Sequence, residues 1–252
     1  MNNSTLHSAA RDGSLSLIET TLNAAISDTE ALKLLLSKDE DERTAFHWAA
    51  AGNFVDVCTL MLERCGDDAA TVRQLLSATD ESGASPLLSA TAANAIHCVR
   101  LLLRVCAGDD ALKAQLVNAS NEQRNTALHY AASKGRDELL LLLLDNGAKK
   151  NALNKLAQTP LMRAVSAGQL RTALLLLERG ASAEHCDAQG NNVLHVAAQQ
   201  FDRPMLLALL RRRAELDVSL DDKNADGKTV ADLVGGADRL TSLIAESETP
   251  AP

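Results

Sequence analysis

Histidine and cysteine are the side chains of this 252-residue chain that could bind a metal ion or act as a base or nucleophile. The histidines are His7, His47, His97, His129, His185 and His195, and the cysteines are Cys58, Cys65, Cys98, Cys106 and Cys186. No two cysteines form a CxxC motif, and neither His97 nor His185 has a Cys or Asp at a ligand spacing. An odd number of cysteines at these spacings favours reduced, packed thiols over a disulfide framework or a zinc site.

Motifs of the common enzyme classes are missing from the sequence. It contains no GxSxG, no HExxH and no glycine-rich loop that could cradle a phosphate. Carboxylates gather in the short segments 39–42, 80–81 and 221–222, where turn formation and solvation account for them. We therefore expect no catalytic residue, no cofactor, no metal and no enzyme activity. An enzyme with a cryptic site is the alternative, and it requires ionisable groups that meet in a closed pocket.

The net charge and the residue composition of the chain indicate which classes of partner to expect. The formal net charge is −8 and aromatic residues make up 2% of the chain. The chain therefore lacks both the basic surface that neutralises phosphates and the rings that stack on bases, and we expect no nucleic-acid ligand. The first residues are polar, and the longest leucine run, Leu139–Leu144, is far shorter than the roughly 20 residues that span a bilayer. We expect no contact with a membrane. We expect a cytoplasmic location, with an additional nuclear location as the alternative.

A short segment recurs along the chain and sets its organisation. Its copies start near residues 4, 44, 85, 126, 159, 192 and 229 and read STLH, TAFH, SPLL, TALH, TPLM, NVLH and TVAD. An alanine lies five residues after each of the first six starts. These copies resemble the Thr-Pro-Leu-His signature of the ankyrin-repeat family. The resemblance implies an all-α solenoid of seven helix–turn–helix repeats with hairpin loops, in a single domain over residues 1–245.

Nine residues after each start, the chain needs a residue that tolerates a left-handed backbone between two helices. Five repeats have Gly or Asn there: Gly13, Asn53, Asn94, Gly135 and Gly168. Repeat six has Phe201 instead, followed by Pro204. We therefore expect repeat six to turn differently.

The first three repeats are longer than the others. The extra residues lie in the segments 28–37, 67–77 and 109–118, which begin with acidic residues and end with apolar ones. This pattern predicts an extra short helix in each segment, whose final apolar pair packs along the edge of the array. A longer loop is the alternative. The polar segment 246–252 predicts a flexible C-terminal tail.

The family resemblance also implies which positions are structural and which are available for binding. It implies that the signature histidines His7, His47, His129 and His195 bridge adjoining repeats. It implies that the residue before each start, and the fourth, seventh and eighth residues after it, face a concave groove. These positions identify the partner-binding candidates Arg43, Trp48, Tyr130, Lys134 and Arg163, with Arg11 and Asp12 at one end.

Arginine and large aromatics dominate binding hot spots, and a structural repeat needs neither type at these groove positions. We therefore predict a partner with an acidic surface, whose carboxylates pair with Arg43 and Arg163. Scattered surface residues without a binding role are the alternative.

Three runs point to a narrower resemblance. RTAFHWA at 43–49, ALHYAASK at 127–134 and GKTVADLVGG at 227–236 are similar to gankyrin-type proteins, the ankyrin-repeat subunits associated with the proteasome regulatory particle. This resemblance implies a non-enzymatic chaperone that binds the C-terminal domain of a proteasomal ATPase subunit. An ankyrin adaptor or scaffold with an unrelated client is the alternative. We expect the protein to be a monomer.

Overall fold

The regular elements of the described residues are helices, which confirms the all-α prediction. The computed structural model describes residues 3–66 and 68–248. The domain predicted over residues 1–245 falls into two compact units, Met1–Ala127 with Leu141–Ala148 and Leu128–Leu140 with Lys149–Pro252. The boundary between the units passes through the helix pair α10 (Ala127–Ser133) and α11 (Asp137–Asp145).

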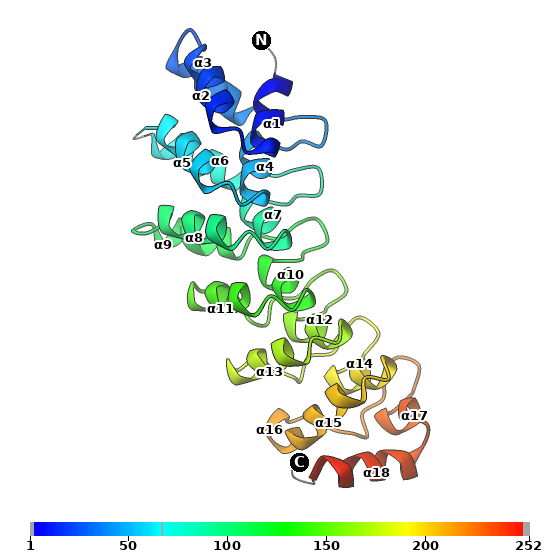
Figure 1. Ribbon diagram of the computed structural model, residues 1–252. Helices are drawn as coiled ribbons and strands as arrows, with labels where there is room; N and C mark the ends of the chain where they lie inside the picture. Colours follow the sequence, from blue (N-terminus) through cyan, green and yellow to red (C-terminus); the bar gives the residue numbers. More distant parts are fainter. Residues whose placement is uncertain (1–2, 67, 249–252) are drawn as a thin grey trace. The chain divides into compact units, whose positions relative to one another are not determined.

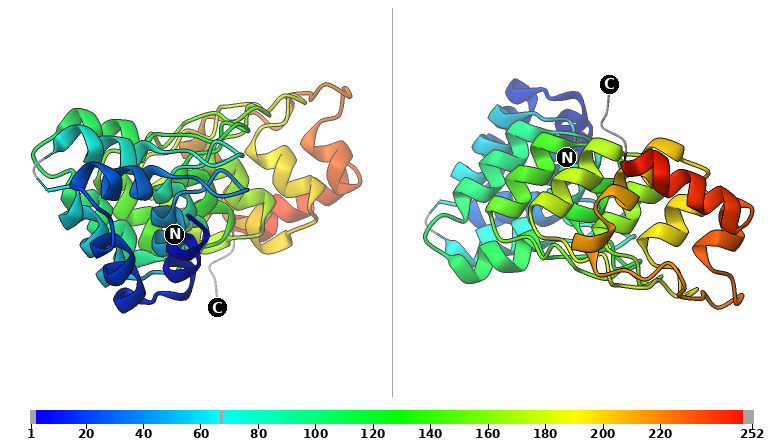
Figure 2. Two further views of the ribbon diagram at one scale, coloured as in Figure 1. Left: turned by 90° about the horizontal axis from the view of Figure 1, so that it is seen from above. Right: turned by 90° about the horizontal axis from the view of Figure 1, so that it is seen from below.

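Three repeats make up most of the first unit, and each has a first helix, a second helix and an extra helix. The first helices are α1 (Asn3–Asp12), α4 (Ala45–Ala51) and α7 (Pro86–Ala92), the second helices are α2 (Leu15–Asn23), α5 (Val55–Arg64) and α8 (Ile96–Val105), and the extra helices are α3 (Asp28–Leu36), α6 (Ala69–Ser77) and α9 (Asp110–Val117). Each helix contacts its counterpart in the next of these repeats. Figure 1 shows the extra helices at the side of this unit away from the hairpin loops, and Figure 2 gives views from above and below.

The extra helices lie in the three segments where the sequence predicts them. A side chain just before each helix accepts a hydrogen bond from a backbone N–H of its first turn, and these capping residues are Ser27, Asp68 and Asp109. Asp67, at the start of one predicted segment, lies outside the described residues. The apolar side chains at the ends of these helices are buried in five of the six predicted positions, namely Leu35, Leu75, Leu76, Leu116 and Val117. Leu34 is half-buried.

The second unit continues with helix pairs and ends in a longer helix. Its further helices are α12 (Pro160–Ser166), α13 (Leu170–Glu178), α14 (Val193–Gln199), α15 (Arg203–Arg211), α16 (Arg213–Leu216), α17 (Val230–Val234) and α18 (Ala237–Glu248). Two ion pairs, Arg203–Glu246 and Arg213–Glu248, join α18 to the preceding repeat. Helix α18 extends to Glu248 and so includes the first residues of the segment 246–252, which the sequence predicts as a flexible tail. Residues 249–252 lie outside the described residues.

Small and aliphatic side chains fill the interior of both units. The alanines that follow the first six repeat starts are fully buried, and they are Ala9, Ala49, Ala90, Ala131, Ala164 and Ala197. Small side chains at these positions let helices approach one another closely, so the interior needs few aromatic rings. Of the helices in the described residues, none combines the length and the apolar character needed to cross a membrane.

An Asp or Asn five residues before the repeat start shapes each hairpin. The Oδ1 atom of Asp80 accepts hydrogen bonds from the backbone N–H groups of Ser82 and Ala84, at 3.0 and 2.9 Å. The corresponding residues in the other hairpins are Asp39, Asn121, Asn154, Asp187 and Asn224. Neighbouring tips are also joined directly, because Glu122 N–H donates to the carbonyl of Ser82 at 2.8 Å. The hairpins therefore keep a common register from one repeat to the next.

Buried histidines connect repeats to the hairpins that follow them. The Nε2 atom of His47 donates to the carbonyl of Ala84 at 3.1 Å, and its Nδ1 atom accepts from the backbone N–H of Thr44 at 3.2 Å. The Nε2 atoms of His7, His129 and His195 likewise lie 3.0 to 3.1 Å from the carbonyls of Ser37, Gln158 and Asp222. Because Thr44 N–H donates to Nδ1, the contacts of His47 require a neutral imidazole.

Repeat six has a left-handed turn residue like the other repeats, so the prediction of a different turn is wrong for the backbone conformation of this residue. Phe201 adopts a left-handed backbone with a φ of 54°, close to the 60° of Asn53 and the 63° of Asn94. Pro204 lies in the first turn of α15, where its missing N–H leaves no hydrogen bond unmade. Asp202 caps this helix by accepting a hydrogen bond from Met205 N–H at 3.0 Å.

We predict that acid destabilises the fold through its buried histidines before most carboxylates titrate. Burial lowers the pKa of His47 and of His129 to about 4, against 6.5 for an ordinary histidine. The folded state then binds fewer protons than the unfolded state, so the free energy of unfolding falls as the pH drops from 6.5 towards 4. The expected loss is about 2–3 kcal/mol for each histidine at pH 4.5, measured by urea denaturation.

The matched variants for this experiment are His47→Gln and His97→Gln. The first should flatten the dependence of unfolding free energy on pH, because it removes one buried titrating group. The second replaces an exposed histidine and should leave that dependence unchanged. Equal unfolding free energies at pH 7 and pH 4.5 in the unmodified protein would contradict the prediction.

Candidate partner-binding site

Trp48 is held by one hydrogen bond and two cations. The residue lies on α4, and its indole N–H donates to Oδ2 of Asp39 at 2.7 Å. The guanidinium carbon of Arg11 lies 3.9 Å from the ring centroid, and that of Arg43 lies 4.6 Å from it. Both distances are within the range of cation–π interactions. The half-buried ring therefore contacts side chains from the first two repeats, namely those of Arg11, Asp39 and Arg43.

Arg43 is paired inside the protein. Its Nε and Nη2 atoms each lie 3.2 Å from Oδ2 of Asp80, whose side chain is only 4% exposed. Burial acts to raise the pKa of Asp80, but hydrogen bonds from Ser82 and Ala84 and the charge of Arg43 outweigh it, so the pKa lies below its usual value. A partner carboxylate would have to compete with Asp80 for Arg43. The expectation that the fold needs no arginine here is corrected by this contact.

Asp39 balances the charge on the other side of the ring. Burial acts to raise the pKa of this carboxyl, but hydrogen bonds from Trp48 and from the backbone N–H groups of Arg43 and Asp41 hold it below its usual value. The charge of His7 acts in the same direction. Asp39 is therefore ionised at neutral pH, and its charge offsets part of the repulsion between the two guanidinium groups beside Trp48.

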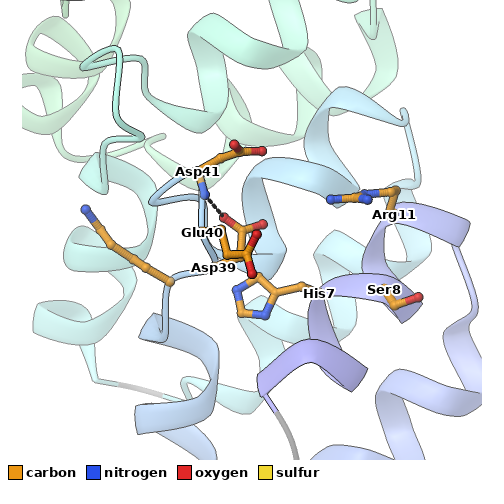
Figure 3. Close-up of a pocket in the computed structure, with 7 residues that line it drawn as sticks. His7, Ser8, Arg11, Asp39, Glu40 and Asp41 are labelled. Atoms are coloured by element: carbon orange, nitrogen blue, oxygen red, sulfur yellow. Dashed lines mark hydrogen bonds between the residues drawn. The ribbon is translucent and has the colours of Figure 1, made fainter.

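Arg11 differs from Arg43 because its guanidinium has no hydrogen bond or ion pair to any of the described residues. It extends from α1 and lines an open hollow of about 540 Å³ (Figure 3). The other residues of this hollow are His7, Ser8, Lys38, Asp39, Glu40 and Asp41. In Figure 3 the carboxylates of the first hairpin and the side chain of Arg11 approach the hollow from different elements. Stacking on Trp48 restricts the exposed Arg11 side chain while its N–H groups stay available to a ligand.

The remaining predicted site residues belong to the second unit. Tyr130 lies half-buried on α10, Lys134 is exposed directly after this helix, and Arg163 is half-buried on α12. After burial, the charge of Arg163 is one of the factors that lower the pKa of His129. The predicted set is therefore divided into an Arg43–Trp48 group in the first unit and a Tyr130–Lys134–Arg163 group in the second.

Sequence reasoning missed the two carboxylates that organise the first group. Asp39 and Asp80 were expected to be solvated turn residues, and they do form turns, but each also binds a side chain of the candidate site. The signal for this was present, because Asp or Asn recurs five residues before the repeat starts. That regular spacing indicates an inward structural position rather than a solvated one.

The thiols of Cys58 and Cys98 lie in the interior of the first unit, on α5 and α8. Their sulfur atoms are 3.8 Å apart, and both residues are fully buried. The neighbouring Cys98 thiol and burial raise the pKa of Cys58, and burial raises the pKa of Cys65 to about 11. Among residues 3–66 and 68–248, no three His, Cys, Asp or Glu side chains are placed to hold a metal ion.

We predict that the two arginines beside Trp48 differ in their effect on stability. Arg43→Ala should lower the free energy of unfolding by about 1–3 kcal/mol, because it leaves the buried Asp80 carboxylate without its cation. Arg11→Ala should cost less than about 1 kcal/mol, since it removes only an exposed cation–π contact. Urea denaturation followed by circular dichroism and by the emission of Trp48, the single tryptophan, measures both. Equal losses for the two variants would show that this division of roles is wrong.

Family models of ankyrin repeats match most of the chain. A model of three ankyrin repeats matches residues 64–154 and 149–222, and a model of one ankyrin repeat matches residues 41–77. No curated protein matches the sequence.

Solved structures give the same fold over nearly the whole chain. The crystal structure of the human ASB11 ankyrin repeat domain is 24% identical, covers 98% of this chain and 99% of its own, and has a TM-score of 0.73. The ankyrin repeat domain of Bcl-3, a member of the IkappaB protein family, is 25% identical, covers 96% of this chain and 97% of its own, and has a TM-score of 0.75. These comparisons give no support for the narrower resemblance to gankyrin-type proteins. The chain belongs to the ankyrin-repeat family.

Proposed function

We propose that the protein is a non-enzymatic protein-binding module that uses the hollow lined by Arg11, whose guanidinium stacks on Trp48, as a partner-binding surface. The observation that carries this proposal is the state of Arg11, which is exposed, stacked on an aromatic ring and without an ion pair among the described residues. An arginine in this state can form two parallel hydrogen bonds to a carboxylate and loses little side-chain freedom on binding. Repeat arrays of this family are protein-interaction modules, which agrees with such a role.

The charges around the hollow define the partner more closely than an acidic surface alone. Arg11 suits a carboxylate of the partner, whereas Glu40 and Asp41 line the same hollow and are exposed. A uniformly acidic segment would be repelled by these two residues. We therefore propose a partner segment that presents a carboxylate to Arg11 and a basic or neutral side chain to the tip of the first hairpin. In the second unit, Lys134 and Arg163 are proposed to pair with further carboxylates, and Tyr130 to supply an aromatic contact.

A narrower proposal is a gankyrin-like chaperone that binds the C-terminal domain of a proteasomal ATPase subunit. It is supported by the sequence runs 43–49, 127–134 and 227–236, and by the exposed Lys134 and half-buried Arg163. The alternative is an adaptor or scaffold that uses the same surfaces for an unrelated client. Binding to the ATPase domain distinguishes the two.

The broader proposal is tested by photo-crosslinking from inside the hollow. A benzophenone amino acid replaces Ser8, which is exposed and lines the hollow, and in a control protein it replaces Gln74, which is exposed on α6. In an extract of the source organism, we expect a protein adduct from position 8 that position 74 does not give. Arg11→Ala in the position-8 protein should reduce the adduct at least tenfold. An adduct that is unchanged by Arg11→Ala would overturn the assignment of this hollow.

The narrower proposal is tested with purified C-terminal domains of the proteasomal ATPase subunits. We expect one of them to bind in isothermal titration, and Arg11→Ala or Arg163→Ala to weaken binding about tenfold or more with at most a small decrease in melting temperature. If none of the domains binds while the crosslinked adduct is formed, the adaptor alternative replaces the chaperone.

A further inference from the structure

Phe201 is an exception among the turn residues that join first and second helices. The other repeats with a full signature have Gly or Asn at this position, and all of them adopt the same left-handed backbone as Phe201. Gly and Asn tolerate this conformation well, whereas a bulky side chain there is an outlier that costs stability. The turn geometry therefore gives no reason for a phenylalanine.

Packing within the fold does not explain the phenylalanine at position 201 either. The side chain of Phe201 is 76% exposed, the largest exposure of any aromatic residue among the described residues. The left-handed backbone of this bulky residue disfavours folding, and a ring that stays in water contributes little burial energy to offset that cost. A residue that neither the turn nor the packing explains is a candidate for contact with a partner, and its surroundings decide whether it has that role.

The surroundings of Phe201 indicate the chemistry of that contact. The ring borders a small hollow of about 60 Å³ between the last two helix pairs of the second unit. The floor is formed by Leu206, Val234 and Leu243, which are buried apolar residues. The hollow is therefore wide enough for a small apolar group and is walled by an exposed ring.

Two arginines border the same hollow. Arg203 is paired with Glu246, whereas Arg239 makes no hydrogen bond or ion pair with the described residues and is exposed. The guanidinium of Arg239 is therefore available to a negatively charged group of a ligand. Phenylalanine and arginine, which both line this hollow, are residue types that are enriched at protein interfaces.

From these contacts we infer that the hollow at Phe201 and Arg239 is a second protein-binding site, for a partner segment in which an apolar side chain is flanked by an acidic residue. The apolar side chain enters the hollow and packs against the ring of Phe201. The neighbouring carboxylate pairs with Arg239. This site lies within the second unit and does not depend on the hollow at Arg11 and Trp48.

The test uses a displayed library of random 12-residue peptides, selected on the full-length protein and counter-selected on the Phe201→Asn variant. Asn is the matched replacement because Asn53 and Asn94 occupy the same turn in other repeats. We expect enriched peptides to combine an apolar residue that fits the small hollow, such as Val or Leu, with Asp or Glu one to three positions away. Synthetic peptides from this pool should bind at least tenfold more weakly to Phe201→Asn and to Arg239→Gln. They should bind equally well to Gln74→Ala, which changes an exposed position on α6 in the first unit.

Stability measurements separate binding from a structural role. Phe201→Asn should leave the melting temperature unchanged or raise it, because it relieves the strained turn. A clear decrease would show that Phe201 supports the fold, and it would overturn the inference. A pool without the apolar–acidic pattern, or peptides that bind Phe201→Asn as well as the unmodified protein, would also overturn it.

Two other occupants are excluded by further measurements. Sedimentation velocity of the full-length protein should show no self-association that Phe201→Asn abolishes, because such a result would identify a second copy of the chain as the occupant. Co-sedimentation with vesicles of phosphatidylserine and phosphatidylcholine should show no binding that depends on Phe201. Either positive result would overturn the assignment to a partner segment.

Discussion

In the four repeats that carry a signature histidine, the contact of its buried imidazole with a carbonyl of the next hairpin ties one repeat to the next. Each repeat has an apolar face that it cannot bury alone, so it must stack on a neighbour. Stacking would also bury polar backbone groups of the hairpin, which need partners once water is removed. The imidazole of His47 supplies such a partner. It is held by Thr44 at the start of its own helix and donates a hydrogen bond to the carbonyl of Ala84 in the next repeat.

The candidate site in the first unit is an extension of this arrangement. Asp39 and Asp80 fold the hairpin tips, and the oxygen of each carboxylate that is not used by the turn binds Trp48 or Arg43. Structural and binding roles are therefore combined in one cluster. The residues that the fold holds firmly create a restricted environment for Arg11, which the fold leaves available. Preorganisation of this kind reduces the entropy lost when a partner binds.

The hollow at Phe201 differs in chemistry from the hollow at Arg11. The first unit presents a charged surface with both signs around a half-buried ring, whereas the hollow at Phe201 presents an exposed ring over an apolar floor with one unpaired cation. A charged surface contributes mainly specificity and association rate, and an apolar hollow contributes mainly affinity. The two proposed sites therefore select partner segments of different chemistry.

The sequence by itself determined the repeat register, the all-helical architecture and the positions of the extra helices, because periodic apolar residues, caps and left-handed turn residues act over a few neighbouring positions. It also predicted a set of candidate binding side chains, and their role in binding stays a prediction. Only the tertiary structure decided that Arg43 is paired with Asp80, that Arg11 is left available, and that Phe201 keeps the common turn with its ring in water. The physical reason is that several charges compete for each partner across repeats. The outcome of that competition depends on side-chain direction and burial, which spacing along the chain does not specify.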